Sequence, residues 1–209
     1  MIPLFRIGSF VVATALVLVF GSASAGGADV AQLYRQSYQA EAKGKPVEAL
    51  QAIRQVEAQV GGSYFVHARA AWLAYLAGRH AESVAAYAKA IAAAPNAIEP
   101  RLGLTAPLLA LKQWRKLERS CRDLLKLDPK NALGRARLAH AHYMVGNYPD
   151  SATHYRSLVA EYPADLNHRT GLGWSLARMG RRKEAKTQFA AVLAVSPDNP
   201  NAKQGMALP

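Results

Sequence analysis

Four prolines stand 34 residues apart along the chain, at Pro95, Pro129, Pro163 and Pro197. Each one closes a stretch of similar sequence, and a fifth, more divergent stretch ends in the same phase at Gly61. The repeated part therefore divides into five units of equal length, residues 30–63, 64–97, 98–131, 132–165 and 166–199. A fixed period of this length is typical of stacked supersecondary units, and it limits the fold before any local structure is considered.

Three kinds of residue recur at fixed places within the units. A glycine stands midway, at Gly44, Gly78, Gly146 and Gly180, and Lys112 replaces it in the third unit. Small residues occupy the eighth place, at Ser37, Ala71, Thr105, Ala139 and Gly173, and the twentieth, at Ala49, Ser83, Ser151 and Ala185. Larger residues follow at Tyr87, Cys121, Tyr155 and Phe189. Because glycine suits a chain reversal and proline ends a helix, each unit predicts two closely packed helices.

This pattern resembles the tetratricopeptide repeat family, and the fifth unit matches best through Leu172, Gly173, Ala185, Phe189 and Pro197. The third unit departs from the pattern with Leu117 at a small-residue place and Pro107 inside a helix, where a kink is expected, and the first unit has Gln36 in place of leucine. The resemblance implies an all-α helix–turn–helix solenoid. The repeat domain is expected to span residues 26–199, and residues 200–209 to form a short tail or partial cap.

The N-terminus has the pattern of a secretory signal. Arg6 precedes an apolar run from Phe10 to Phe20, and Ala23 and Ala25 fit the small residues of a signal-peptidase site. The apolar run is shorter than the roughly 20 residues that a membrane-spanning helix needs. We therefore predict a signal peptide over residues 1–25 and a periplasmic protein. The alternative is an uncleaved segment that anchors the chain in the inner membrane.

The resemblance also implies a concave groove lined by the first helix of each unit. Carried over to this sequence, the implied partner-binding residues are Tyr34, Tyr38, Phe65, Trp72, Tyr75, His140, Tyr143, Trp174 and Arg178. The lysine and asparagine of the family's carboxylate clamp are missing, since Tyr34 and Tyr38 stand in their places. An aromatic groove favours an amphipathic helix or an extended apolar peptide. The alternative is that tight curvature buries these rings as core.

The chain is basic, with 26 Lys and Arg against 14 Asp and Glu and a net charge of +12. A second candidate surface is an outer basic face at helical spacing, formed by Arg115, Arg119, Arg122 and Lys126. Such a face suits an acidic protein, an anionic membrane or an anionic glycan, but a solvated helix face explains it equally simply. The basic run from Arg178 to Lys186 falls mostly on a turn between helices.

Nothing in the sequence favours catalysis. The chain has one cysteine, Cys121, at a place where other units have an aromatic core residue. His140 and His142 are two residues apart, so on a helix they point to different faces and do not share a metal. The expectation is therefore a protein without catalytic residues, cofactor or metal.

At the C-terminus, the segment after Pro197 begins like a sixth unit and stops. A bare apolar edge beside Leu172, Leu176 and Met206 is therefore expected, open to self-association or to a partner.

These features together predict a protein–protein interaction scaffold of the periplasm, within an envelope assembly or export machine. The alternative function is binding of a polysaccharide or cell-wall glycan as an accessory to exopolysaccharide export. Nucleic acid is not an expected partner, because the signal directs export.

Overall fold

The computed structural model describes residues 25–209, and within that range every regular element is an α-helix. The predicted signal peptide of residues 1–25 lies outside the described residues, apart from Ala25, where the first helix begins. The first helices of the five pairs are α1 (Ala25–Ala42), α3 (Tyr64–Leu76), α5 (Glu99–Ala110), α7 (Ala132–Met144) and α9 (Leu166–Arg178). The second helices are α2 (Pro46–Val60), α4 (His80–Ala93), α6 (Trp114–Leu127), α8 (Tyr148–Glu161) and α10 (Arg182–Val195), and α11 (Pro200–Met206) follows them.

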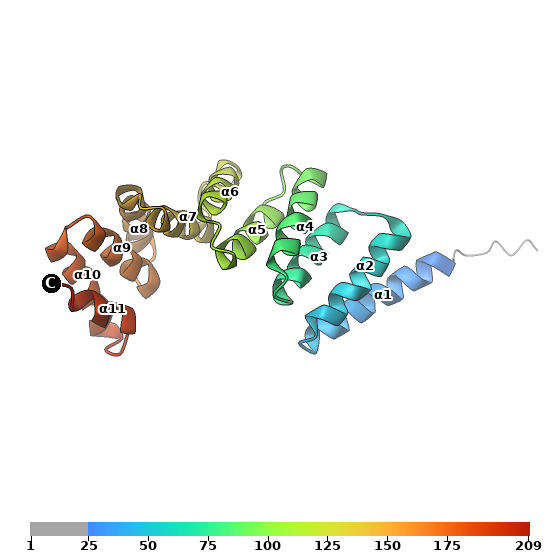
Figure 1. Ribbon diagram of the computed structural model, residues 1–209, viewed down its shortest axis with the longest axis horizontal. Coiled ribbons are helices and arrows are strands. Elements are labelled where there is room, and N and C mark those ends of the chain that lie inside the picture. Colours follow the sequence, from blue (N-terminus) through green and yellow to red (C-terminus); the bar gives the residue numbers. More distant parts are fainter. Residues whose placement is uncertain (1–24) are drawn as a thin grey trace, which may run out of the picture.

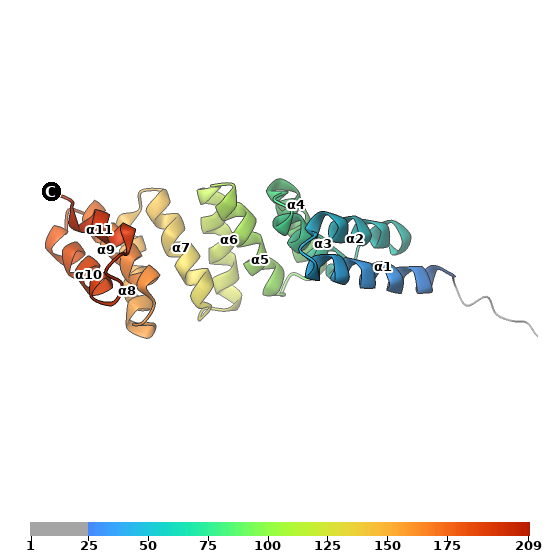
Figure 2. The ribbon, with the colours of Figure 1, turned by 90° about the horizontal axis from the view of Figure 1, so that it is seen from below.

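The helix pairs stack side by side along one axis, with α1 at one end and α11 at the other (Figure 1 and Figure 2). Each helix packs against the next one in the chain, and from α3 onwards each odd-numbered helix also packs against the next odd-numbered helix. No two even-numbered helices of the described chain approach each other as closely. The odd-numbered helices therefore form the inner, concave row, which confirms the predicted all-α helix–turn–helix solenoid.

The turns between paired helices depend on a left-handed backbone. Gly44, Gly78, Gly146 and Gly180 have φ values of 70°, 73°, 83° and 77°. Lys112 adopts φ 54° at the same place in the third unit, and it is the one non-glycine residue of the described chain with positive φ. An L-residue in this region is sterically strained, whereas glycine is not.

Helix ends also follow the repeat. The helices α4, α6, α8 and α10 each end two residues before the proline that closes their unit. The last residue of four units caps the helix that follows, because the side chains of Ser63, Asn131, Asp165 and Asn199 accept hydrogen bonds from backbone N–H groups in the first turn. Pro107 lies inside α5, which continues to Ala110.

Successive units join in two different ways, depending on the residue at the twenty-fourth place. In three junctions an aromatic ring from the second helix meets a glycine on the next inner helix. A Cβ atom on Gly103 would lie 2.4 Å from Tyr87, one on Gly171 2.5 Å from Tyr155, and one on Gly205 2.3 Å from Phe189. We call these the ring–glycine junctions.

The other two junctions have a smaller residue at the twenty-fourth place, Ile53 or Cys121, and both are fully buried. The next inner helix then carries an arginine where the ring–glycine junctions have glycine. Arg69 donates hydrogen bonds to the Ser37 hydroxyl, and Arg137 donates one to the Thr105 hydroxyl. We call these the arginine–hydroxyl junctions.

The C-terminal edge differs from the sequence-based expectation. Leu172 and Leu176 are only 3% and 2% exposed, so they do not form a bare apolar edge. They share a hydrophobic cluster with Phe189 and with Ala202 of α11. The short helix α11 thus covers the last repeat as a partial cap, and Met206 remains exposed at its end.

Replacing the strained lysine by glycine tests the turn geometry. We expect Lys112→Gly to stabilise the fold by up to about 1 kcal/mol. The left-handed conformation costs an L-residue roughly 1–2 kcal/mol, and the larger conformational entropy that glycine loses on folding offsets part of this gain. Thermal melts by circular dichroism measure the change, with the reverse substitution Gly180→Lys as the control that should lower the melting temperature. A lower melting temperature for Lys112→Gly would contradict this account.

A second substitution tests the close approach inside the fifth unit. A Cβ atom on Gly173 would lie 2.6 Å from Cε1 of Phe189. We expect Gly173→Leu to overpack this contact and to destabilise the fold by about 1–3 kcal/mol. The exposed Lys183→Ala change should stay within about 0.5 kcal/mol of the parent. Equal melting temperatures for the two variants would show that the repeat phase is misassigned.

Candidate functional site

The aromatic residues expected in the groove fall into two separate groups on the concave face. Tyr34 and Tyr38 lie on α1, and Phe65, Trp72 and Tyr75 lie on α3. The remaining predicted residues are His140 and Tyr143 on α7 and Trp174 and Arg178 on α9. The helix α5 lies between the two groups and carries no aromatic side chain.

Three rings of the N-terminal group are open to solvent. Tyr38, Phe65 and Trp72 are 49%, 51% and 42% exposed. Phe65 meets the half-buried Tyr34 edge-on, with 6.0 Å between ring centroids. Trp72 lies at the same distance, 6.0 Å, from Tyr75. The rings of each pair hold one another in place while one ring of each pair stays exposed, and exposed rings of this kind can bind apolar side chains.

Arg69 organises the polar part of this group. Its guanidinium lies 3.6 Å from the centre of the Tyr38 ring, and its Nη1 pairs with Oε2 of Glu41 at 3.0 Å. The indole N–H of Trp72 donates to the other oxygen of Glu41 at 2.6 Å. The charge of Arg69 is therefore neutralised within the protein, and Glu41 fixes the orientation of Trp72.

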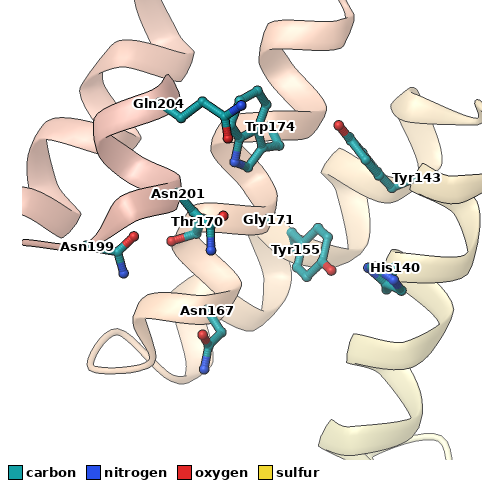
Figure 3. Close-up of a pocket in the computed structure, with 10 residues that line it drawn as sticks. All are labelled: His140, Tyr143, Tyr155, Asn167, Thr170, Gly171, Trp174, Asn199, Asn201 and Gln204. Atoms are coloured by element: carbon teal, nitrogen blue, oxygen red, sulfur yellow. The ribbon is translucent and has the colours of Figure 1, made fainter. Parts of the chain in front are cut away.

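The C-terminal group forms a cavity of about 630 Å³. Side chains from α7, α8, α9 and α11 converge on it, as Figure 3 shows. The lining residues are His140, Tyr143, Tyr155, Asn167, Thr170, Gly171, Trp174, Asn199, Asn201 and Gln204. The ring–glycine junction brings Tyr155 to this cavity, since any side chain on Gly171 would occupy the place of its ring.

The lining of this cavity is uncharged at neutral pH. Burial lowers the pKa of His140 and raises the pKa of Tyr155 to about 12. Within residues 25–209, the side chains of Asn167, Asn201 and Gln204 make no hydrogen bond to the protein, so their amides can donate and accept. The cavity suits a neutral polar ligand such as a peptide backbone or a sugar.

Trp174 and Arg178 have different surroundings. Trp174 contacts the core ring of Phe189 edge-on at 5.3 Å, so it is half-buried. Arg178 is exposed, lies 5.4 Å from the centre of the Tyr148 ring and donates to its hydroxyl at 3.2 Å. Of the two, Arg178 is the more accessible to a partner.

The second candidate surface lies on α6, in the outer row. Arg115, Arg119, Arg122 and Lys126 are all exposed there. Arg115 and Arg122 both pair with Glu118, at 3.6 Å and 2.8 Å, and Lys126 pairs with Asp123 at 2.7 Å. Arg119 alone of the four has no ion pair within the described chain. Two carboxylates therefore compensate about half of the positive charge of this face.

The groups with catalytic potential are buried. Cys121 is fully buried, and burial raises the pKa of its thiol to about 12, so the nucleophilic thiolate does not form at neutral pH. His142 is buried and stacks on His154 at 5.6 Å, on a different side of α7 from His140. Within residues 25–209 there is no group of three metal-ligating side chains and no helix both long and apolar enough to cross a membrane.

No protein-family model matches the sequence, and no curated protein matches it. Solved structures match its shape. A tetratricopeptide repeat protein from Parabacteroides merdae superposes with a TM-score of 0.79 at 16% identity, over 87% of this chain and 72% of the other. The chain has the tetratricopeptide repeat fold.

Two further structures extend the comparison of the tetratricopeptide fold. MamA from Desulfovibrio magneticus, from residue 41 to its end, superposes with a TM-score of 0.77 at 18% identity, over 84% of this chain and 99% of the other. YrrB is described as a TPR protein with an unusual peptide-binding site. It superposes with a TM-score of 0.76 at 12% identity, over 88% of this chain and 98% of the other.

Sequence reasoning missed four parts of this tetratricopeptide surface. It did not assign Arg69 or Arg137 to the groove, it placed Tyr155 only in the core, and it left the amides of α11 out. The sixth place of the units carries either arginine or glycine, and this restriction was a visible signal for the two arginines. No comparable signal exists for Tyr155, because its ring reaches the cavity only where the next unit has a glycine, Gly171.

Proposed function

We propose that this protein is a non-enzymatic interaction scaffold that binds a peptide or helical segment of a partner protein along its concave face. The observation that carries the proposal is the set of exposed rings formed by Tyr38, Phe65 and Trp72. Arg69 packs on Tyr38, Glu41 accepts a hydrogen bond from Trp72, and Phe65 packs edge-on against Tyr34. Large aromatic side chains on rigid helices lose little entropy on contact and commonly dominate binding energy.

The similarity to YrrB supports this proposal, because that protein has the same fold and is described as having a peptide-binding site. The proposed setting is the periplasm, within an envelope assembly or export machine. Its support is the signal-like sequence of residues 1–25, which precedes the first helix of the solenoid.

One observation favours a second function, the binding of a polysaccharide or cell-wall glycan. The C-terminal cavity combines aromatic rings with unpaired amides and carries no charge, and neutral sugars are recognised by such groups. A glycan would then occupy the cavity between α7, α9 and α11 and leave the exposed rings of α1 and α3 without a ligand.

The first test of function removes the indole of Trp72. We expect Trp72→Ala to weaken capture of peptides from a random display library by at least tenfold, since a truncated hot spot typically costs about 2 kcal/mol or more. Melting should fall by only a few degrees, because the ring is 42% exposed. The control is Arg119→Ala on the outer row, which should leave peptide capture unchanged.

The results of this test separate the candidate functions. Loss of the fold in Trp72→Ala would show that the ring is structural and would contradict the groove proposal. Binding to a glycan array that survives Trp72→Ala but is lost on Trp174→Ala would favour the second function.

The proposed location has its own measurement. Signal peptidase should cleave after Ala25, because Ala23 and Ala25 are the small residues that the enzyme requires. Intact-mass measurement of the exported protein should give a chain that begins at Gly26. A full-length chain recovered with the membrane fraction would instead support the uncleaved anchor.

A further inference from the structure

The two arginine–hydroxyl junctions place equivalent arginines on the concave side, two repeat periods apart. Arg69 and Arg137 both stand at the sixth place of their units, and each reaches back to a hydroxyl at the eighth place of the preceding unit. Arg69 and Arg137 can therefore be compared directly, because they occupy the same place of the repeat and differ in their neighbours.

Arg69 has a complete set of partners within the protein. Besides Ser37, it pairs with Glu41 and packs against the Tyr38 ring. It is 8% exposed. Its positive charge is compensated and its open face is covered.

Arg137 lacks both of these partners. Leu109 stands where Glu41 would be, and Ala106 stands where Tyr38 would be. Its Nη1 donates to the backbone carbonyl of Leu102 at 3.0 Å and to Thr105, which are neutral groups. The ionisable side chains that act on it are Cys121, Tyr75 and Tyr87, and no carboxylate of the described chain is among them.

An uncompensated guanidinium in this position is energetically unfavourable. Burial lowers the pKa of Arg137, yet a guanidinium stays charged at neutral pH. A partly buried charge without a counter-charge is destabilising, and a carboxylate that reaches it forms a charge-assisted, two-pronged hydrogen bond. Arg137 is less buried than Arg69, and the residue at the place of Tyr38 is the small Ala106.

We propose that Arg137 binds the carboxylate of an aspartate or glutamate in the partner peptide, taking the role that Glu41 has for Arg69. This inference rests on the proposed peptide-binding function and specifies the chemistry of the partner. The net charge of +12 makes the protein as a whole attractive to acidic segments.

The position of Arg137 fixes where the acidic residue lies. Its guanidinium contacts α5, which separates the exposed rings of α1 and α3 from the neutral cavity of α7, α9 and α11. A peptide that follows the concave face would place apolar side chains on the N-terminal rings, its acidic residue at Arg137 and backbone or amide groups in the cavity.

The test combines a variant of the protein with a variant of the peptide. Peptides recovered from the random display library on the full exported protein should carry a shared Asp or Glu. A synthetic peptide with this residue changed to Gln or Asn should bind the parent protein at least tenfold more weakly. Arg137→Met should bind both peptides with the same reduced affinity, because the two changes remove the same contact.

The matched control is Arg119→Met, which removes the same charge from an exposed position without an ion pair. It should keep the parent's preference for the acidic peptide. Arg137→Lys should bind with intermediate affinity, because it keeps the charge but loses the planar fork. If Arg137→Met does not fold, Arg137→Lys still tests the contribution of Arg137, and equal binding of the acidic and amide peptides to the parent protein would contradict the inference without any variant.

Three results would overturn the inference. If capture depends on Trp72 but the acidic and amide peptides bind alike, the proposed function stands and the role of Arg137 is wrong. If no peptide binds in a Trp72-dependent way, the proposed function itself fails. If a uronic-acid polysaccharide binds and is lost with Arg137→Met, while no acidic peptide binds, the carboxylate comes from a glycan and not from a protein.

Discussion

The contact on which the solenoid depends is the insertion of one side chain from each outer helix between two successive inner helices. Phe189 shows it most clearly: its ring lies against Gly173 of its own unit and against Gly205 of the following helix. Both glycines would clash with this ring if they carried a side chain. The ring therefore sets the spacing within a unit and the spacing between units at once. Each helix packs on the next one along the chain, so the stack is held by contacts between neighbouring units, as is usual for repeat proteins.

The size of the inserted side chain then determines the chemistry of the concave face. A ring leaves room only for glycine on the next inner helix, and at Tyr155 the concave surface is a cavity lined by uncharged side chains that include the ring itself. A smaller residue such as Ile53 or Cys121 leaves space that an arginine fills by reaching a hydroxyl of the preceding unit. Packing in the core and charge in the groove are thus coupled, so an exchange of a core residue in this chain would change what the groove can bind.

Much of the fold was predictable because the repeat fixes it locally. Turn glycines, closing prolines and small residues at the eighth and twentieth places each act within one unit, and the structure places them as the period indicates. The bare apolar edge expected beside Leu172 and Leu176 is not found, because both side chains are buried in a cluster that includes Ala202 of α11. Gly205 of α11 accepts the ring of Phe189, and Ala202 joins the same hydrophobic cluster. The groove residues were predictable as positions, but their exposure and pairing were not, since both depend on neighbours about one period away.

The comparison of Arg69 with Arg137 shows how a repeat protein can be read for function without relatives. In a fold without repeats, no equivalent arginine would be available for comparison with Arg137. Its hydrogen bonds to Leu102 and Thr105 would then be interpreted as ordinary structural contacts. Here the first junction supplies the reference, because the arginine at the same place of the repeat has a carboxylate and a ring among its partners. The groups that Arg137 lacks are those on the solvent-facing side of the junction, where a ligand would arrive, and the groups that it keeps are those toward the core. An arginine that lacks partners only on its solvent-facing side, and keeps those toward the core, has the pattern expected of a binding position. A weakened structural contact would lack partners on both sides.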